Sequence, residues 1–141
     1  MKRGLFFAMI LLTVLGCSDK ITVKGTVKFS DGEPVTRGSV FFGNAAGTHQ
    51  YYGVIKPDGS FSLGGLKDGE GIPMGKYSAW LAGVNTSEYG VDERGKSWER
   101  VSIIMDPKFG IPQTSGLSYD IQGKTNIEIT VERPPAARGR R

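Results

Sequence analysis

The chain contains the stretch Ile21-Thr22-Val23-Lys24-Gly25-Thr26-Val27-Lys28-Phe29, in which apolar and polar side chains largely alternate. In an extended backbone, one face of this stretch carries Ile21, Val23, Val27 and Phe29. A period of two is typical of a strand in an antiparallel sheet, with one face buried and the other in solvent. The stretch Asn126-Ile127-Glu128-Ile129-Thr130-Val131-Glu132 repeats the pattern. The two stretches therefore predict half-buried strands at the beginning and the end of the fold.

The residues between these two stretches predict further short strands separated by tight turns. The strand candidates are 39–43, 51–56, 60–63, 77–84, 101–105 and 117–121. Turn sequences occur at Asp31-Gly32, Asp58-Gly59, Asp68-Gly69 and Gln122-Gly123. The 21 glycines fit many turns, and no segment carries a convincing helical stripe. We predict one domain over residues 21–132, an all-β antiparallel sandwich of about seven or eight strands. Its first and last strands would pair or lie on facing sheets.

Three segments of this domain resemble a known family. They are Val23-Lys24-Gly25-Thr26-Val27, Asp31-Gly32-Glu33-Pro34-Val35 and Gly38-Ser39-Val40-Phe41-Phe42, and together they resemble the opening of carboxypeptidase regulatory-like domains. Pro57-Asp58-Gly59-Ser60-Phe61-Ser62-Leu63 is similar to a turn of that family. The segment Pro112-Gln113-Thr114-Ser115-Gly116-Leu117 and the closing strand are similar to a subgroup of small bacterial lipoproteins carrying one such domain. The resemblance implies a transthyretin-like β-sandwich that serves as an accessory, adhesive or structural module. It implies no reaction, since the shared motifs are structural.

The N-terminus predicts export and lipid anchoring. Lys2 and Arg3 precede an uncharged, mostly apolar run over residues 4–16, which has the length of a secretory signal and is too short to span a bilayer. The segment Val14-Leu15-Gly16-Cys17 resembles the lipobox of bacterial lipoproteins. Cys17 is the only cysteine, so no intramolecular disulfide can form. We therefore expect a signal peptide over 1–16, lipidation of Cys17, a linker over 17–20, and a membrane-anchored lipoprotein on the periplasmic or cell-surface side.

The positive charge of the chain is concentrated at its two ends. The formal net charge is +4, but Lys2 and Arg3 would leave with the signal peptide, which leaves 16 basic against 14 acidic residues. Residues 133–141 hold four arginines beside Pro-Pro and Gly, a composition typical of a disordered basic tail. Without that tail, 12 basic residues stand against 14 acidic ones. A nucleic-acid-binding function is therefore not expected, because it needs a basic patch on the fold itself.

One stretch matches a nucleotide-binding motif letter for letter. Gly90-Val91-Asp92-Glu93-Arg94-Gly95-Lys96-Ser97 fits the P-loop pattern G-x-x-x-x-G-K-[ST]. That loop binds phosphates only between a buried parallel strand and a helix, and neither is predicted here. Asp92 and Glu93 would also place two carboxylates where polyphosphate must bind. We expect neither a nucleotide nor any other cofactor.

Catalytic and metal-binding patterns are weak. His49 is the only histidine, no G-x-S-x-G stretch is present, and zinc needs three or four ligands, so we predict no catalytic residue, no metal ligand and no enzyme activity. The acidic turns Asp31-Gly32-Glu33 and Asp68-Gly69-Glu70-Gly71 could supply oxygen ligands to calcium, although neither has the spacing of a known calcium loop. Calcium binding stays open at this point.

Residues 85–115 interrupt the strand pattern for about thirty residues, whereas connections in compact domains commonly have ~4 to 6. We interpret this stretch as a polar, mobile excursion in which residues 88–100 bind a protein partner of the cell envelope, with Phe109 as a further aromatic anchor. The predicted contact residues are Tyr89, Arg94, Trp98 and Arg100. The alternative is a carbohydrate-binding lipoprotein that stacks sugars of surface polysaccharide on Trp80, Trp98, Tyr51, Tyr52 or Tyr89. A hydrolase accessory domain is a more distant alternative.

Overall fold

The computed structural model describes residues 19–65, 67 and 69–136. The expected signal peptide and Cys17 lie outside the described residues. So do residues 137–141 of the expected tail and Asp68 of the second acidic turn.

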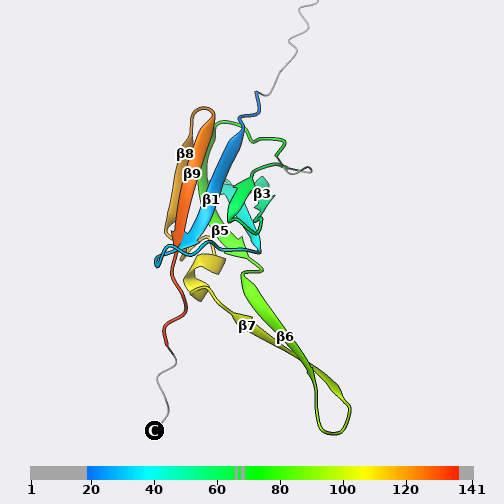
Figure 1. Ribbon diagram of the computed structural model, residues 1–141. Coiled ribbons are helices and arrows are strands. Elements are labelled where there is room, and N and C mark those ends of the chain that lie inside the picture. Colours follow the sequence, from blue (N-terminus) through cyan, green and yellow to red (C-terminus); the bar gives the residue numbers. More distant parts are fainter. Residues whose placement is uncertain (1–18, 66, 68, 137–141) are drawn as a thin grey trace, which may run out of the picture.

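The described residues form a β-sandwich with one projecting hairpin (Figure 1). One sheet has the strand order β4 (Ser60–Ser62), β1 (Val23–Phe29), β9 (Thr125–Val131). The facing sheet has the order β3 (Gln50–Val54), β2 (Ser39–Asn44), β5 (Gly75–Ala82), β8 (Leu117–Ile121). The hairpin consists of β6 (Asn85–Val91) and β7 (Ser97–Ile103), and a 3-10 turn, η1 (Pro107–Gly110), follows it. The predicted all-β sandwich is confirmed, with seven strands in its two sheets.

The first and last strands pair with each other, as one of the two predicted arrangements required. β9 runs parallel to β1, with Val23 opposite Thr125 and Phe29 opposite Val131. The other ladders among the described strands are antiparallel. A parallel pair needs a long crossover, and here nearly the whole domain between Phe29 and Thr125 forms it.

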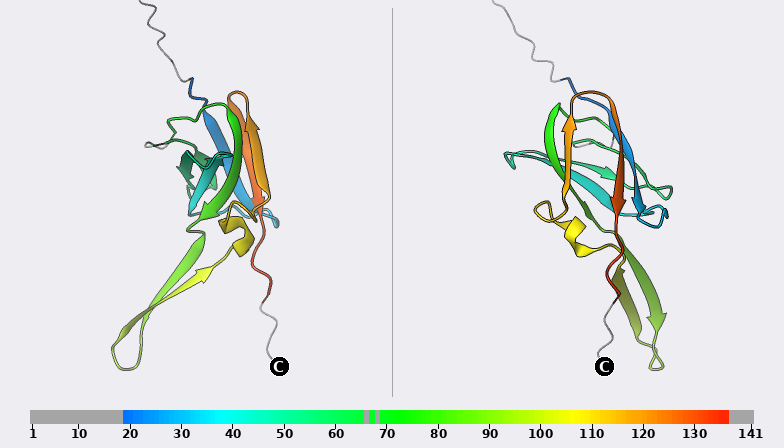
Figure 2. Two further views of the ribbon diagram at one scale, coloured as in Figure 1. Left: turned by 180° about the vertical axis from the view of Figure 1, so that it is seen from behind. Right: turned by 90° about the vertical axis from the view of Figure 1, so that its left-hand side faces the viewer.

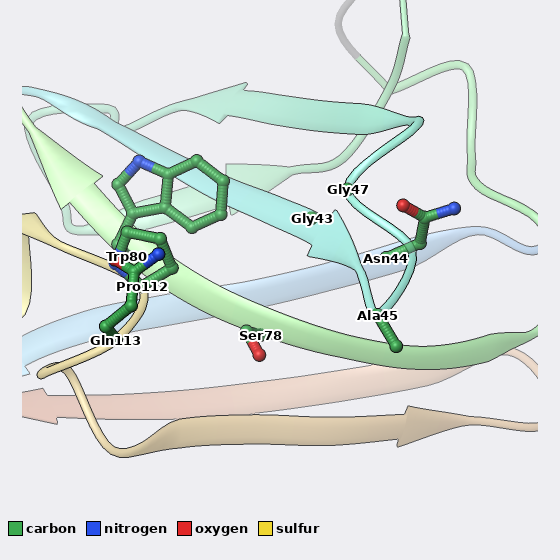
Figure 3. Close-up of a pocket in the computed structure, with 8 residues that line it drawn as sticks. All are labelled: Gly43, Asn44, Ala45, Gly47, Ser78, Trp80, Pro112 and Gln113. Atoms are coloured by element: carbon green, nitrogen blue, oxygen red, sulfur yellow. The ribbon is translucent and has the colours of Figure 1, made fainter.

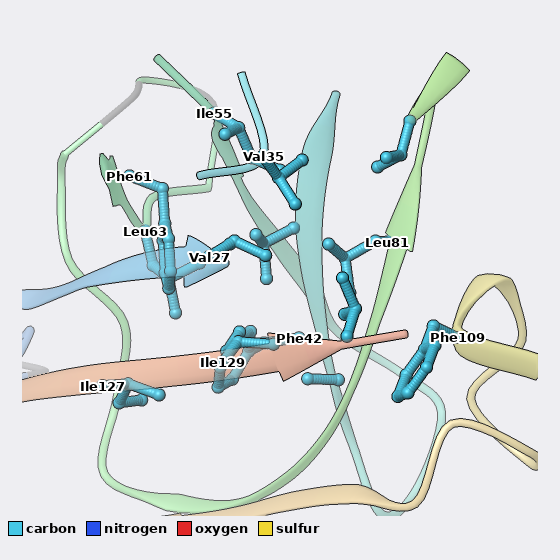
Figure 4. Packing of buried hydrophobic residues seen from close by; sticks show 14 of the residues in the cluster. Val27, Val35, Phe42, Ile55, Phe61, Leu63, Leu81, Phe109, Ile127 and Ile129 are labelled. Carbon is cyan, nitrogen blue, oxygen red and sulfur yellow. The ribbon is translucent and has the colours of Figure 1, made fainter. Parts of the chain in front are cut away.

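The core fills the space between the two sheets (Figure 4). The burial pattern of β1 alternates along the strand, and that of β9 does the same, so the sequence periodicity corresponds to the two faces of one sheet. The largest fully buried side chains include Phe42, Phe61, Leu63, Ile72, Leu81, Ile121 and Ile129. The buried hydroxyl of Ser115 donates a hydrogen bond of 2.6 Å to the carbonyl of Ala79, which satisfies the one buried polar residue among the described positions.

The interpretation of residues 85–115 as an irregular excursion is wrong. Residues 85–103 form a regular antiparallel hairpin, in which Asn85 lies opposite Ile103 and Val91 opposite Ser97. The residues that follow return to the sandwich, where Phe109 is only 6% exposed and belongs to the core. Phe109 is therefore a packing residue of η1 and cannot be the surface anchor that the composition indicated.

Gly25 allows the close packing of β1 against its neighbours. A Cβ atom at this position would lie 2.3 Å from the Ile127 carbonyl oxygen and 2.6 Å from the Phe61 ring. We expect Gly25→Ala to lower the free energy of unfolding by about 1–3 kcal/mol or more, as overpacking of a core does. Gly123→Ala is the matched control, because a Cβ there meets nothing within 4 Å. Urea denaturation of both variants measures the difference, and equal stability of the two would contradict this account of β1.

Candidate functional site

The β6–β7 hairpin extends beyond the sandwich as a two-stranded ribbon (Figures 1 and 2). Its seven paired positions run from Asn85–Ile103 to Val91–Ser97. Every residue of β7 is exposed, and no residue of β6 is buried. Among the described residues, neither outer edge of the ribbon pairs with another strand. The backbone donors and acceptors of both edges therefore face solvent, the condition in which a sheet can accept a further strand.

The turn of the hairpin contains the P-loop-like string. The Asp92 carboxylate accepts hydrogen bonds from the backbone amides of Arg94 at 2.9 Å and of Lys96 at 2.8 Å. Gly95 has a φ of 76°, a left-handed conformation that favours glycine. The string thus comprises the end of β6, a tight turn and the start of β7, so a strand follows the turn where the motif would require a helix. Its amides bind the protein's own carboxylate, in place of the phosphate cradle that the motif would require.

One face of the hairpin carries four exposed apolar side chains. Because side chains alternate along each strand and paired residues share a face, this face carries Tyr89 and Val91 from β6 and Val101 and Ile103 from β7. Their exposures are 74%, 66%, 54% and 60%, respectively. The residues directly opposite them on the same face are polar: Glu99, Ser97, Ser87 and Asn85. Large apolar side chains that lie together in solvent are typical of an interaction surface. We call these four residues the apolar hairpin face.

The opposite face is built around Trp98. Gly90 lies directly opposite Trp98, and a Cβ at Gly90 would lie 2.3 Å from the indole ring, so the ring lies flat across the glycine. The Arg100 guanidinium carbon lies 5.6 Å from the Trp98 ring centroid, within the range of a cation–π contact. Trp98 remains 42% exposed and outside the core.

The four predicted contact residues share the hairpin but not one surface. Tyr89 lies on the apolar hairpin face, Trp98 and Arg100 lie on the opposite face, and Arg94 lies in the turn. Val91 lies within the predicted binding segment 88–100 but was not among the named contact residues, and Val101 and Ile103 lie outside that segment. Their spacing of two along each strand is the pattern that could have identified them, had the two stretches been recognised as paired strands.

The hairpin begins at the end of the sandwich farthest from the start of β1. The Asp106 amide, just after the hairpin, donates a 2.8 Å hydrogen bond to the Glu132 carbonyl, just after the end of β9. β1 and β9 run parallel, so the first residue of β1 lies a full strand away, about 20 Å for seven residues. The described chain therefore begins at one end of the sandwich, and the hairpin projects from the other (Figure 2).

The remaining candidates show ordinary turn and surface contacts. The Asp31 carboxylate accepts a 2.8 Å hydrogen bond from the Arg133 guanidinium, which lowers the pKa of this carboxyl. Arg133 also lies over the Phe29 ring, so this first residue of the expected tail contacts the domain. Exposed His49 contacts the Thr48 hydroxyl. Within the described residues, no three His, Cys, Asp or Glu side chains gather as metal ligands would, and no helix is long and apolar enough to cross a membrane.

Comparisons with known proteins show no family. No family model matches the chain, and no curated protein matches it. Among solved structures, it is similar to the major pilin subunit of Bacillus cereus, with a TM-score of 0.44 and 14% identity over 82% of this chain and 30% of the pilin. It is also similar to a 9R-lipoxygenase from Cyanothece PCC8801, with a TM-score of 0.38 and 13% identity over 82% of this chain and 16% of that one. The chain spans less than a third of either protein, and similarity at this level assigns no function.

The contact between Gly90 and Trp98 can be tested by fluorescence. In a Trp80→Phe background, Trp98 is the only tryptophan. Gly90→Ala should push the indole off the ribbon, because the new methyl group would occupy the ring's position, and its emission should shift to longer wavelength. Thr86→Ala, on the same face but nearer the sandwich, should leave the emission unchanged. Identical spectra for all three proteins would contradict the flat stacking of Trp98.

Proposed function

We propose that the chain is a membrane-anchored, non-enzymatic module of the cell envelope that holds a protein partner through the β6–β7 hairpin. The observation that carries the proposal is the hairpin itself. Its outer edges pair with no other strand that the structure describes, and the four residues of the apolar hairpin face are each more than half exposed. A two-stranded ribbon is at best marginally stable in water, and a third strand with a covered apolar face would stabilise it. The resemblance to carboxypeptidase regulatory-like domains supports an accessory or structural role over a catalytic one.

The partner that fits this surface is an extended segment of an envelope protein. Such a segment would add a strand to one edge of the ribbon, and main-chain hydrogen bonds would supply most of the binding. Specificity would come from alternate side chains, which would lie beside Tyr89 and Val91 at the β6 edge or beside Val101 and Ile103 at the β7 edge. Arg100 and Glu88, directly opposite each other on the other face, would favour one register of the incoming strand.

The proposed lipid anchor would orient this surface. Cys17 lies two residues before the first described residue, and the chain enters the sandwich at the end opposite the hairpin (Figure 1). A lipid on Cys17 would therefore hold that end near the bilayer and leave the hairpin directed away from it, toward other envelope proteins. A cysteine that carries several acyl chains can anchor a protein stably, whereas one acyl chain gives only weak, reversible binding to the membrane.

Two exposed valines provide a matched test of partner binding. Val101 lies on the hairpin and Val54 on β3, and their exposures are 54% and 48%. A photo-crosslinking amino acid at position 101 should capture one defined envelope protein in intact cells, because the partner strand would cover this face. The same probe at position 54 should not capture it. Val101→Arg should abolish the complex, and Val54→Arg should leave it intact. Equal capture from both positions, or no capture from 101, would overturn the proposal.

Lipidation of Cys17 has its own test. Cells fed an alkyne analogue of palmitate should label the wild-type chain, since the cysteine thiol would carry the acyl-bearing lipid. Cys17→Ala should remain unlabelled and should leave the membrane fraction. Equal labelling of the two proteins would show that the lipid lies elsewhere, and the absence of label from both would show that the apolar run is an ordinary secretory signal.

A further inference from the structure

A row of three aromatic rings crosses the outer surface of the four-stranded sheet. Tyr52 on β3 lies directly opposite Phe41 on β2, which lies directly opposite Trp80 on β5. The ring centroids are 6.2 Å apart for Tyr52 and Phe41 and 5.7 Å apart for Phe41 and Trp80. The Phe41 and Trp80 planes differ by only 12°. Phe42 and Ala79, the next residues along their strands, face the core, so the row lies on the solvent side and is half-buried.

Trp80 is fixed in position against the sheet. A Cβ at Gly43 would lie 3.0 Å from the indole, so this glycine lets the ring lie close to the β2 backbone. The Phe41 ring, nearly parallel to the indole with its centroid 5.7 Å away, packs against it as well. An indole restrained in this way loses little further rotamer freedom when a ligand stacks on it, which favours binding.

A depression of about 320 Å³ adjoins the Trp80 end of the row (Figure 3). Its lining residues are Gly43, Asn44, Ala45, Gly47, Ser78, Trp80, Pro112 and Gln113. The turn after β2 forms one side, and the segment with Pro112 and Gln113 forms another. The volume is at the lower end of the range of small-ligand sites and suits one or two sugar units.

The lining carries no charge, and its polar side chains are those of Asn44, Ser78 and Gln113. It contains no Asp, Glu, Lys, Arg or His. The Asn44 carboxamide oxygen accepts hydrogen bonds from the backbone amides of Thr48 and His49, and these bonds hold the turn in shape. The Ser78 hydroxyl and the Gln113 carboxamide make no hydrogen bond to any other residue that the structure describes, and both residues are exposed. These two groups can donate to and accept from ligand hydroxyls.

We propose that this surface binds a neutral glycan. The apolar C–H face of a pyranose ring would stack on Trp80, and the next units would follow the row over Phe41 and Tyr52. Hydroxyl groups of the sugar would bond to Ser78 and Gln113. Cross-strand packing accounts for the Phe41–Trp80 stack, but it does not account for an uncharged, hydrogen-bonding depression beside the indole. A nucleic-acid strand would stack equally well but needs a basic groove, which this lining lacks. The site is separate from the apolar hairpin face and does not depend on the function proposed for it.

Calorimetric titration of the full chain tests the proposal. The protein is kept in a zwitterionic detergent, because detergents with sugar headgroups would compete. The ligands are neutral hexasaccharides of glucose, mannose, xylose and N-acetylglucosamine. At least one should bind, and Trp80→Ala should weaken its affinity by about tenfold or more, the scale found when a stacking ring is removed from a base-binding site. Trp98→Ala, the matched tryptophan control, should bind as the wild type does.

Two further measurements separate a loss of glycan binding from a loss of folding and from binding through charge. Ser78→Ala removes only an exposed hydroxyl, so it should retain the wild-type unfolding midpoint and still weaken binding. Affinity should be unchanged between about 0.05 and about 0.5 M salt, since the lining has no charge to screen. The proposal is overturned if no hexasaccharide binds, if Trp98→Ala weakens binding as much as Trp80→Ala, or if only anionic oligosaccharides bind in a salt-dependent way. Loss of glycan binding would leave the crosslinking result at Val101 untouched, so the two proposals fail separately.

Discussion

The parallel pairing of β1 with β9 is the constraint on which the rest of the structure depends. β1 is the central strand of its sheet, between β4 and β9, and its inward residues Val23, Val27 and Phe29 lie level with Thr125, Ile129 and Val131 of the last strand. Since the pairing joins the two ends of the domain, the other strands all lie within the crossover that it closes. Contacts of such long sequence separation cost loop-closure entropy, and the buried apolar side chains on both strands offset that cost.

Much of the sandwich could be predicted from the sequence because its strands bury one face. In β1 and β9 the buried positions recur with a period of two, and the apolar residues follow them. The direction of the final strand could not be predicted in this way, because alternation gives the face of a strand and not its orientation. The hairpin was missed for a related reason. Neither of its faces is buried, so its polar and apolar residues mix as they would in a loop, and its register is visible only once the two strands are paired.

The aromatic row shows a second limit of sequence patterns. Phe41, Tyr52 and Trp80 belong to three separate strands and are neighbours only through the registers of β2 with β3 and β5. Each of the three residues could be expected in a strand, but its position alone did not show which face of the sheet it would occupy. Gln113 and Pro112 come from the segment after η1, which no periodicity places beside β5. The depression is therefore a property of the tertiary structure, and its residues cannot be grouped by their spacing along the chain.

The two candidate surfaces lie on one molecule but are mechanically separate. The hairpin begins after Gly83, which has a φ of 70°, and its base is held by buried Val84 and Met105. Beyond that base, β6 and β7 contact chiefly each other, so bending of the ribbon would change few contacts of the core. The aromatic row instead lies on three adjacent strands of one sheet. The other side of that sheet packs against the core, and a close-packed core resists deformation. A partner on the hairpin and a glycan on the sheet would consequently bind without a built-in coupling. Under the two proposals, the chain would therefore act as a connector between a protein and a polysaccharide and not as a switch between them.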